Sequence, residues 1–322
     1  MPRNVSIHTV RAAASRIYSV AARTPLIRLD PIGRSLPRIY LKLELFQPIG
    51  SFKIRGAMNA VAQLPPREIR GGVWTVSAGN AAQGVALAAR EAGAPASVLV
   101  MDGAPATKLN AIERLGAKIV KAPFDECWKA VEQHESDRME GRLVHPFDDD
   151  DFISGNGTLA LEVLEDLPTV DAIVAPMGGG GLLAGIGAVF EELKTDARVY
   201  AAEPENAAPL ATSLAAGRPM RFEGWSRSWV DGAGGQSVLP SMWPFLERYV
   251  SESIVVPLDD AARAMKQVAE RCRVIIEGAA ACAVAAAQSP RLKAAGHENV
   301  VAVVSGGNID LSRFASLVGA CS

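Results

Sequence analysis

The stretch Gly50-Ser51-Phe52-Lys53-Ile54-Arg55-Gly56-Ala57 joins a predicted buried strand at residues 39–43 to a predicted helix at residues 58–64. Lys53 therefore lies where a strand turns into a helix, and helix N-termini carry partial positive charge and free N–H groups. An ammonium group is unfavourable there, so we expect a lowered pKa for Lys53, as a nucleophilic lysine requires. Considered alone, however, one lysine in such a turn is more often an ordinary surface residue.

Strands and helices are predicted to alternate along most of the chain, with short connections between them. Apolar runs predict strands at residues 39–43, 72–76, 95–101, 117–120, 171–175, 198–202 and 299–304. Helices are predicted at residues 10–21, 58–64, 85–92, 106–115, 128–138, 158–164, 182–193, 258–274 and 279–287. This alternation is typical of α/β proteins built on parallel sheets.

Three stretches depart from this alternation. Residues 24–29 predict a short edge strand, because Pro25 cannot donate to a β-ladder. Residues 148–151 are four consecutive aspartates and predict an exposed acidic turn at a domain boundary, with residues 155–157 as the start of the next helix. Residues 207–251 are rich in loops and carry no assigned element.

The composition is that of an ordinary globular protein, and 322 residues suggest two domains. A net charge of −2 gives no reason to expect nucleic acid or an anionic membrane as a partner. No uninterrupted apolar run reaches the roughly 18 residues of a membrane span, and no secretory signal is recognised. The four cysteines form no C-x-x-C pair and the histidines no H-x-x-x-H, so we expect no zinc site and a cytoplasmic location.

Four of the predicted strands end in small polar or glycine-rich turns. These turns are Gly50 to Lys53, Ser77 to Asn80, Gly178 to Gly181, and Ser305 to Asn308. In open parallel sheets, ligands bind beyond the carboxyl ends of the strands. We therefore expect the four turns to converge on one ligand.

The turn of Gly178, Gly179, Gly180 and Gly181 predicts an anion site, because a backbone without Cβ atoms can approach a phosphate closely at a helix N-terminus. A Walker A loop would end in Gly-Lys-Ser/Thr, and two leucines follow here instead.

A dinucleotide-binding interpretation of the same turn stays open. Gly179, Gly181 and Ala184 fit the pattern G-x-G-x-x-A, and Glu203 lies at a strand end, where a ribose-binding acid would sit. This interpretation predicts an NAD-dependent oxidoreductase, but it gives no role to Lys53 or to the serine and asparagine turns.

Taken together and in order, the four turns resemble those of the fold-type II pyridoxal-phosphate enzymes, and more narrowly those of the serine/threonine dehydratase and serine racemase group. The resemblance runs from about Thr24 to Asp310. It implies two open parallel-sheet α/β domains with the active site between them: a large cofactor-binding domain of residues 1–68 and 149–322, and a small domain of residues 69–148. It also implies a homodimer.

The resemblance assigns a role to each turn. Lys53 would form the Schiff base with pyridoxal phosphate and act as the base at Cα, with Phe52 packed beside the cofactor. Asn80 would bind the ring hydroxyl, and Ser305 the pyridine nitrogen. The phosphate would lie on the glycine turn, and the substrate carboxylate on the loop Ser77-Ala78-Gly79-Asn80-Ala81. Glu277 lies at a helix start near the ring, where it is either an ordinary N-terminal acid or a direct participant.

Three positions depart from the family pattern. Ala81 replaces the usual histidine, which leaves room for a bulkier substrate. Ala78 stands where serine racemases have a second serine, the proton carrier on the far face, so efficient racemisation is not expected. The racemase-like metal site would use Glu203, the Ala207 carbonyl and a carboxylate at residue 209, but that residue is Pro209, so a bound metal is in doubt.

We therefore predict a pyridoxal-phosphate-dependent ammonia-lyase that converts serine, threonine or a related 3-hydroxy amino acid to a 2-oxo acid and ammonia. The alternatives are a dehydratase for a bulkier 3-hydroxy amino acid, the NAD-dependent oxidoreductase, and a small-molecule-binding protein that kept the fold and lost the chemistry.

Overall fold

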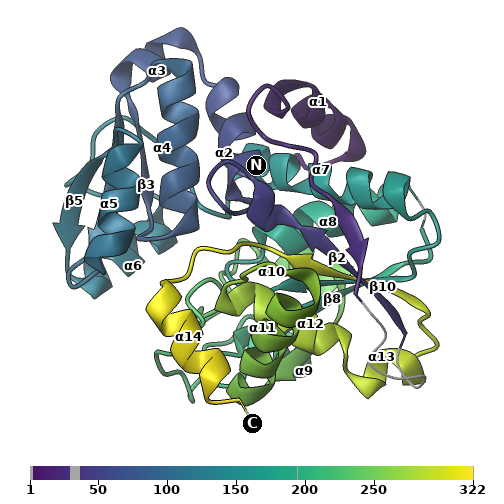
Figure 1. Ribbon diagram of the computed structural model, residues 1–322. Coiled ribbons are helices and arrows are strands. Elements are labelled where there is room, and N and C mark those ends of the chain that lie inside the picture. Colours follow the sequence, from purple (N-terminus) through teal and green to yellow (C-terminus); the bar gives the residue numbers. More distant parts are fainter. Residues whose placement is uncertain (1–2, 30–36, 194, 322) are drawn as a thin grey trace.

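The computed structural model describes residues 3–29, 37–193 and 195–321, and in this part of the chain the strands form two sheets (Figure 1). The larger sheet has six strands in the order β1-β2-β10-β7-β8-β9. Their bounds are β1 Leu26–Arg28, β2 Arg38–Leu43, β7 Ala172–Pro176, β8 Arg198–Pro204, β9 Val250–Val256 and β10 Asn299–Val304. The expected α/β fold with parallel sheets is confirmed.

All neighbours in the larger sheet are parallel except β1, which runs antiparallel to β2. β1 lies at the edge of the sheet, as predicted from Pro25. β10 lies between β2 and β7, so Val301 pairs with Tyr40 on one side and Ile173 on the other. The carboxyl ends of β2, β10, β7 and β8 consequently share one edge of the sheet. The turns that follow these strands are thereby brought together.

Helices cover both faces of the larger sheet, because its strands are apolar on both sides (Figure 1). Ile173 and Ala175 of β7 pack with one set of helices, whereas Ala172 and Val174 pack with the other. The first set is α1 Ile7–Ile17, α7 Asp150–Asp166, α8 Gly181–Glu192 and α10 Trp243–Tyr249. The second set is α11 Leu258–Cys272, α12 Gly278–Ala287, α13 Pro290–Ala294 and α14 Leu311–Gly319.

The smaller sheet is fully parallel, in the order β5-β4-β3-β6. Its strands are β3 Val73–Val76, β4 Ala96–Met101, β5 Lys118–Ala122 and β6 Arg142–Leu143. The helices of this part are α3 Pro66–Gly71, α4 Asn80–Ala92, α5 Ala106–Arg114 and α6 Phe124–Gln133. All four strands lie within residues 69–148; the boundaries given above for the two domains stay a prediction.

Two local predictions were wrong. Residues 148–151 are not an exposed turn: Asp148 is 7% exposed, Asp149 caps α7 by accepting the N–H groups of Asp151 and Phe152, and the helix begins at Asp150. Residues 155–157 do not start the helix but lie inside it. The loop-rich stretch contains α9 Pro209–Ala216, α10 and the first two residues of β9. None of the described helices has the length and apolar character needed to cross a bilayer.

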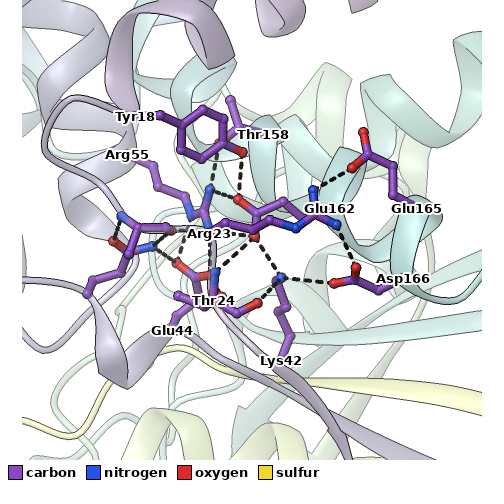
Figure 2. A network of polar contacts seen from close by, with 12 residues as sticks. Tyr18, Arg23, Thr24, Lys42, Glu44, Arg55, Thr158, Glu162, Glu165 and Asp166 are labelled. Carbon is purple, nitrogen blue, oxygen red and sulfur yellow. Dashed lines mark hydrogen bonds and ion pairs between the residues drawn. The ribbon is translucent and has the colours of Figure 1, made fainter.

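The helix after the opening stretch is α2 Lys53–Ala62, which begins five residues earlier than predicted and packs between α4 and α7. Its third residue, Arg55, is fully buried in a network of charged side chains (Figure 2). Arg55 Nε and Nη2 donate to the two carboxylate oxygens of Glu44, at 2.8 Å each. Arg55 Nη1 and Nη2 also donate to Glu162 on α7, at 2.6 and 3.0 Å.

Lys42 of β2 completes this network, with its Nζ 2.6 Å from Glu162 and 2.7 Å from the Thr24 carbonyl oxygen. Burial alone would raise the pKa of Glu162, but Arg55 and Lys42 more than offset it, and the pKa is lowered. The network therefore holds two buried cations against two buried carboxylates and ties α2 to β2 and α7. The first turn of α2, which carries Lys53, is fixed to the larger sheet by these contacts.

Candidate active site

Lys53 is the first residue of α2, and its side chain is partly buried. Its Nζ donates a hydrogen bond to the Pro146 carbonyl oxygen at 2.5 Å and lies 5.2 and 5.3 Å from the ring centroids of Phe52 and Phe152. Burial lowers the pKa of Lys53 to about 8, although the negative charge of Glu277 opposes this shift. The direction agrees with the expectation from the sequence, but desolvation is its main cause rather than the helix end.

The turn before Lys53 and the turn after β10 are joined by backbone contacts. Ser51 and Gly306 form an antiparallel bridge, and the N–H of Phe52 donates to the Ser305 carbonyl at 3.0 Å. Ser305 is 1% exposed, and its hydroxyl has no hydrogen-bond partner. Because an unpaired buried hydroxyl is costly, Ser305 is suited to bind a polar atom of a ligand.

The glycine turn follows β7 and opens α8. Gly180 has φ +92°, a conformation that favours glycine, and caps the helix. A Cβ on Gly179 would lie 2.1 Å from the ring of Phe147, and one on Gly181 would lie 2.6 Å from the Phe147 carbonyl oxygen. The backbone therefore packs where no side chain fits, and its N–H groups at the start of α8 can bind an anion.

Asn80 connects the two sheets at this site. It is the first residue of α4, and its Nδ2 donates to both carboxylate oxygens of Glu277, at 2.9 and 3.1 Å. Asn308, in the turn after β10, donates to Asn80 Oδ1 at 2.8 Å. Burial raises the pKa of Glu277 to about 7, and the hydrogen bond from Asn80 partly offsets this effect.

The loop of residues 77–81 presents small groups to the same region. Gly79 donates its N–H to the Ser77 hydroxyl at 3.1 Å, and Ala78 contributes only a methyl group. Ala81 is 4% exposed at the second position of α4. First-turn N–H groups of a helix lack partners within it, so the start of α4 can bind a carboxylate.

Glu203 lies at the end of β8, but its carboxylate has other partners. Its oxygens accept the N–H groups of Leu210 and Ala211 at the start of α9 and the hydroxyl of Ser253, at 2.8, 2.8 and 2.6 Å. Glu203 is fully buried, and burial raises its pKa to about 7. These contacts argue against a ribose-binding role and against a metal-ligand role. Among the described residues, no three His, Cys, Asp or Glu side chains are grouped to hold a metal ion.

No sequence pattern identifies the segment of residues 145–148 as part of the site, although it contacts Lys53 through Pro146 and the glycine turn through Phe147. The strand before it, β6, has only two residues and is too short to recognise from an apolar run. A backbone carbonyl also carries no side-chain signature. The one sequence feature that could have pointed to this segment is His145-Pro146, a histidine and a proline that follow a short strand.

Comparisons with known proteins agree on one family. A family model described as pyridoxal-phosphate dependent enzyme matches residues 17–306. The chain is 35% identical over 317 residues to an L-threonine ammonia-lyase of Thermotoga maritima, covering 98% of this chain and 78% of that protein. It is 38% identical over 315 residues to the serine racemase of Homo sapiens, covering 96% and 92%. The structure of maize serine racemase superposes with a TM-score of 0.89 at 33% identity, covering 97% and 96%.

Proposed function

Because the chain belongs to the family of pyridoxal-phosphate-dependent enzymes, we propose that it is an ammonia-lyase that converts a 3-hydroxy amino acid such as threonine or serine to a 2-oxo acid and ammonia. The threonine ammonia-lyase among its relatives supports deamination, whereas the serine racemases make racemisation the main competitor. Family membership and the contacts of Glu203 together argue against the NAD-dependent oxidoreductase.

The residues present fit pyridoxal phosphate. The buried, unpaired hydroxyl of Ser305 suits the pyridine nitrogen, and the glycine turn, where a Cβ would collide with Phe147, suits the phosphate. Lys53 would hold the cofactor covalently through its amine, with Phe52 beside it, and Asn80 would bind its ring hydroxyl. When bound, the cofactor supplies a ring that withdraws electrons from the Cα of an amino acid.

The protein side of the reaction depends on Lys53. Its amine, when free and neutral, would accept the proton from Cα. The electron pair left at Cα would form the Cα–Cβ double bond as the Cβ–O bond breaks, and the β-hydroxyl would leave as hydroxide or water. The first-turn N–H groups of α4 and the Ser77 hydroxyl would hold the substrate carboxylate. Ser305 carries no negative charge and would not keep a ring nitrogen protonated, which favours elimination over transamination.

One observation carries the choice of lyase over racemase: the loop of residues 77–81 offers no proton carrier at position 78. Racemisation needs such a group on each face of Cα. Ala78 has only a methyl group, and the neighbouring Ser77 hydroxyl is the one that would hold the substrate carboxylate.

The test is to incubate the purified holoenzyme with the two enantiomers of serine, with threonine and with bulkier 3-hydroxy amino acids. We expect 2-oxo acid and ammonia in equal amounts, with little of the opposite enantiomer. Faster formation of D-serine than of 2-oxo acid would reject the proposal in favour of a racemase. Bound cofactor without turnover of any substrate would indicate a binding protein.

Restoring the missing hydroxyl should shift this balance. We expect Ala78→Ser to raise the ratio of racemisation to elimination on L-serine by about tenfold or more, because proton donors placed in this way contribute at least that much. Ala81→Ser is a matched control, since it adds the same hydroxyl at a buried neighbouring position. An unchanged ratio in Ala78→Ser would remove the basis of the choice between lyase and racemase.

The pKa of Lys53 predicts a pH dependence. Since the pKa is lowered to about 8 and only the neutral amine accepts a proton, kcat should fall about tenfold per pH unit below pH 8 and level off above it. The measurement is kcat between pH 6 and pH 9.5 at saturating substrate. A rate that is constant from pH 6 to pH 8 would show that Lys53 is not the group that titrates.

Adding one methyl group to the glycine turn should weaken cofactor binding. In Gly179→Ala, the new Cβ collides with the Phe147 ring and displaces the turn, so we expect affinity for pyridoxal phosphate to fall about 10- to 100-fold. Titration of cofactor-free protein by absorbance measures this loss. Gly71→Ala is the control, because a Cβ there meets no atom within 4 Å.

A further inference from the structure

The segment His145-Pro146-Phe147-Asp148 connects the smaller sheet to α7, and it is anchored at several points. Asp148 is 7% exposed; it pairs with Arg3 at 2.6 Å and accepts the hydroxyl of Ser241 at 2.5 Å. Phe147 lies against the glycine turn, as described above. The Pro146 carbonyl accepts the hydrogen bond from Lys53. One short segment therefore contacts both the amine and the proposed phosphate site.

His145 fixes the conformation of this segment through hydrogen bonds between its ring and the backbone. Its Nδ1 accepts the N–H groups of Asp148 and Phe147, at 2.8 and 3.3 Å, and its Nε2 lies 3.1 Å from the Val131 carbonyl oxygen. This arrangement requires the neutral ring with its proton on Nε2. The ring is 2% exposed and stacks on His134 with 4.4 Å between centroids. Burial lowers the pKa of His145 to about 3, an effect that the charge of His134 reinforces and that of Asp148 opposes.

We propose that His145 is a positioning residue for Lys53: by fixing the turn of residues 145–148, it holds the Pro146 carbonyl as the acceptor of the Lys53 amine whenever that amine is free. The inference deepens the proposed function, in which Lys53 acts as the base. Between proton transfers the amine then has one defined place beside the substrate, rather than many rotamers.

The carbonyl also affects the charge of the amine. A carbonyl oxygen that accepts a hydrogen bond favours the ammonium form, so its loss lowers the pKa of Lys53. Glu277 faces Lys53 and favours the ammonium as well, while His134, Asp148 and Lys53 itself act on His145. His145 stays neutral in the range tested below, so a shift of the pH profile reports on the carbonyl and not on titration of His145.

Three substitutions separate the contacts of His145. His145→Asn places an amide oxygen near the position of Nδ1 and keeps the acceptor for Asp148. His145→Gln places its amide near Nε2, so it keeps the contact to Val131 and loses that acceptor. His145→Leu removes both contacts. If the leucine variant does not fold, the asparagine and glutamine variants still form a matched pair.

The experiment has two readouts for each variant, after thermal unfolding has shown that it folds. The first is the pH profile of kcat for the holoenzyme. The second is the rate at which the cofactor-free protein captures pyridoxal phosphate, followed by absorbance from pH 6 to pH 9.5. This second readout reports on the Lys53 amine without any substrate, so it stays valid even if the proposed lyase reaction fails.

We expect the midpoint of both profiles to move about one pH unit lower in His145→Gln and His145→Leu, the equivalent of one charge-assisted hydrogen bond, and the plateau rates to fall. His145→Asn should keep the parental midpoint. A merely structural role would lower the unfolding temperature and leave the midpoints unchanged in all variants. That result, or an asparagine variant that behaves like the leucine variant, would overturn the proposal.

Discussion

Replacing Lys53 with methionine is expected to abolish catalysis, with kcat/KM reduced by at least about 10⁴-fold. The variant loses both the covalent link to the cofactor and the base at Cα. Because the same amine performs both functions, one substitution removes most of the rate acceleration. Borohydride reduction of the parental holoenzyme should attach the cofactor irreversibly to the peptide that contains Lys53. No such adduct should form in Lys53→Met.

Lys53→Met should not unfold the protein. Methionine has a similar length and removes the cost of burying an amine, so the unfolding temperature of the cofactor-free protein should be unchanged or higher. Lys293→Met, on the exposed side of α13, is the matched control and should keep both activity and the adduct. Full elimination activity in Lys53→Met, or an adduct at another lysine, would remove Lys53 from the proposed site.

Most of the strands, and the turns that follow them, could be predicted from the sequence because strands of a parallel sheet are apolar on both faces and end in short turns. The strand at residues 299–304 is an example: the run predicts it, and β10 has the same bounds. The family resemblance added a role for each turn. What no local pattern provides is the pairing of distant elements, such as β10 inserted between β2 and β7.

The error at residues 155–157 has a physical cause. Glycine weakens an isolated helix, so two glycines predict a helix start rather than its interior. In α7 they allow close packing instead. A Cβ on Gly155 would lie 2.3 Å from the Arg55 carbonyl oxygen of α2, and one on Gly157 would lie 3.0 Å from the Gly185 carbonyl oxygen of α8. The stabilisation comes from packing against α2 and α8, and the local sequence does not reveal which helices lie next to α7.

The prediction of an exposed turn at the four aspartates of residues 148–151 is wrong for a similar reason. A run of like charges is usually solvated, but Asp148 is buried because Arg3 and Ser241, both far away in the chain, supply its partners. The contacts of Pro146 and Phe147 likewise depend on tertiary structure. The candidate site could therefore be predicted where side-chain chemistry identifies it, as at Lys53, and not where a backbone carbonyl or a packed ring supports it.

Replacing Arg55 with methionine is expected to lower the free energy of unfolding by about 3–5 kcal/mol, the cost of leaving buried charges without a partner. Arg55 is fully buried and binds Glu44 through two parallel hydrogen bonds (Figure 2). Without it, Glu162 keeps Lys42, but the partners that Glu44 keeps among the described residues are neutral: the Thr24 hydroxyl and the Gln47 amide. The measurement is urea unfolding at a fixed cofactor concentration, because bound cofactor adds to the apparent stability.

The double variant Arg55→Met with Glu44→Gln tests this cause, because it removes the unpaired carboxylate and should recover part of the loss. Arg67→Met, at a side chain that is 82% exposed, should change stability by less than about 0.5 kcal/mol. A loss in Arg55→Met that Glu44→Gln does not relieve would mean that Arg55 stabilises α2 by packing alone, and that the charge network does not fix the turn that carries Lys53.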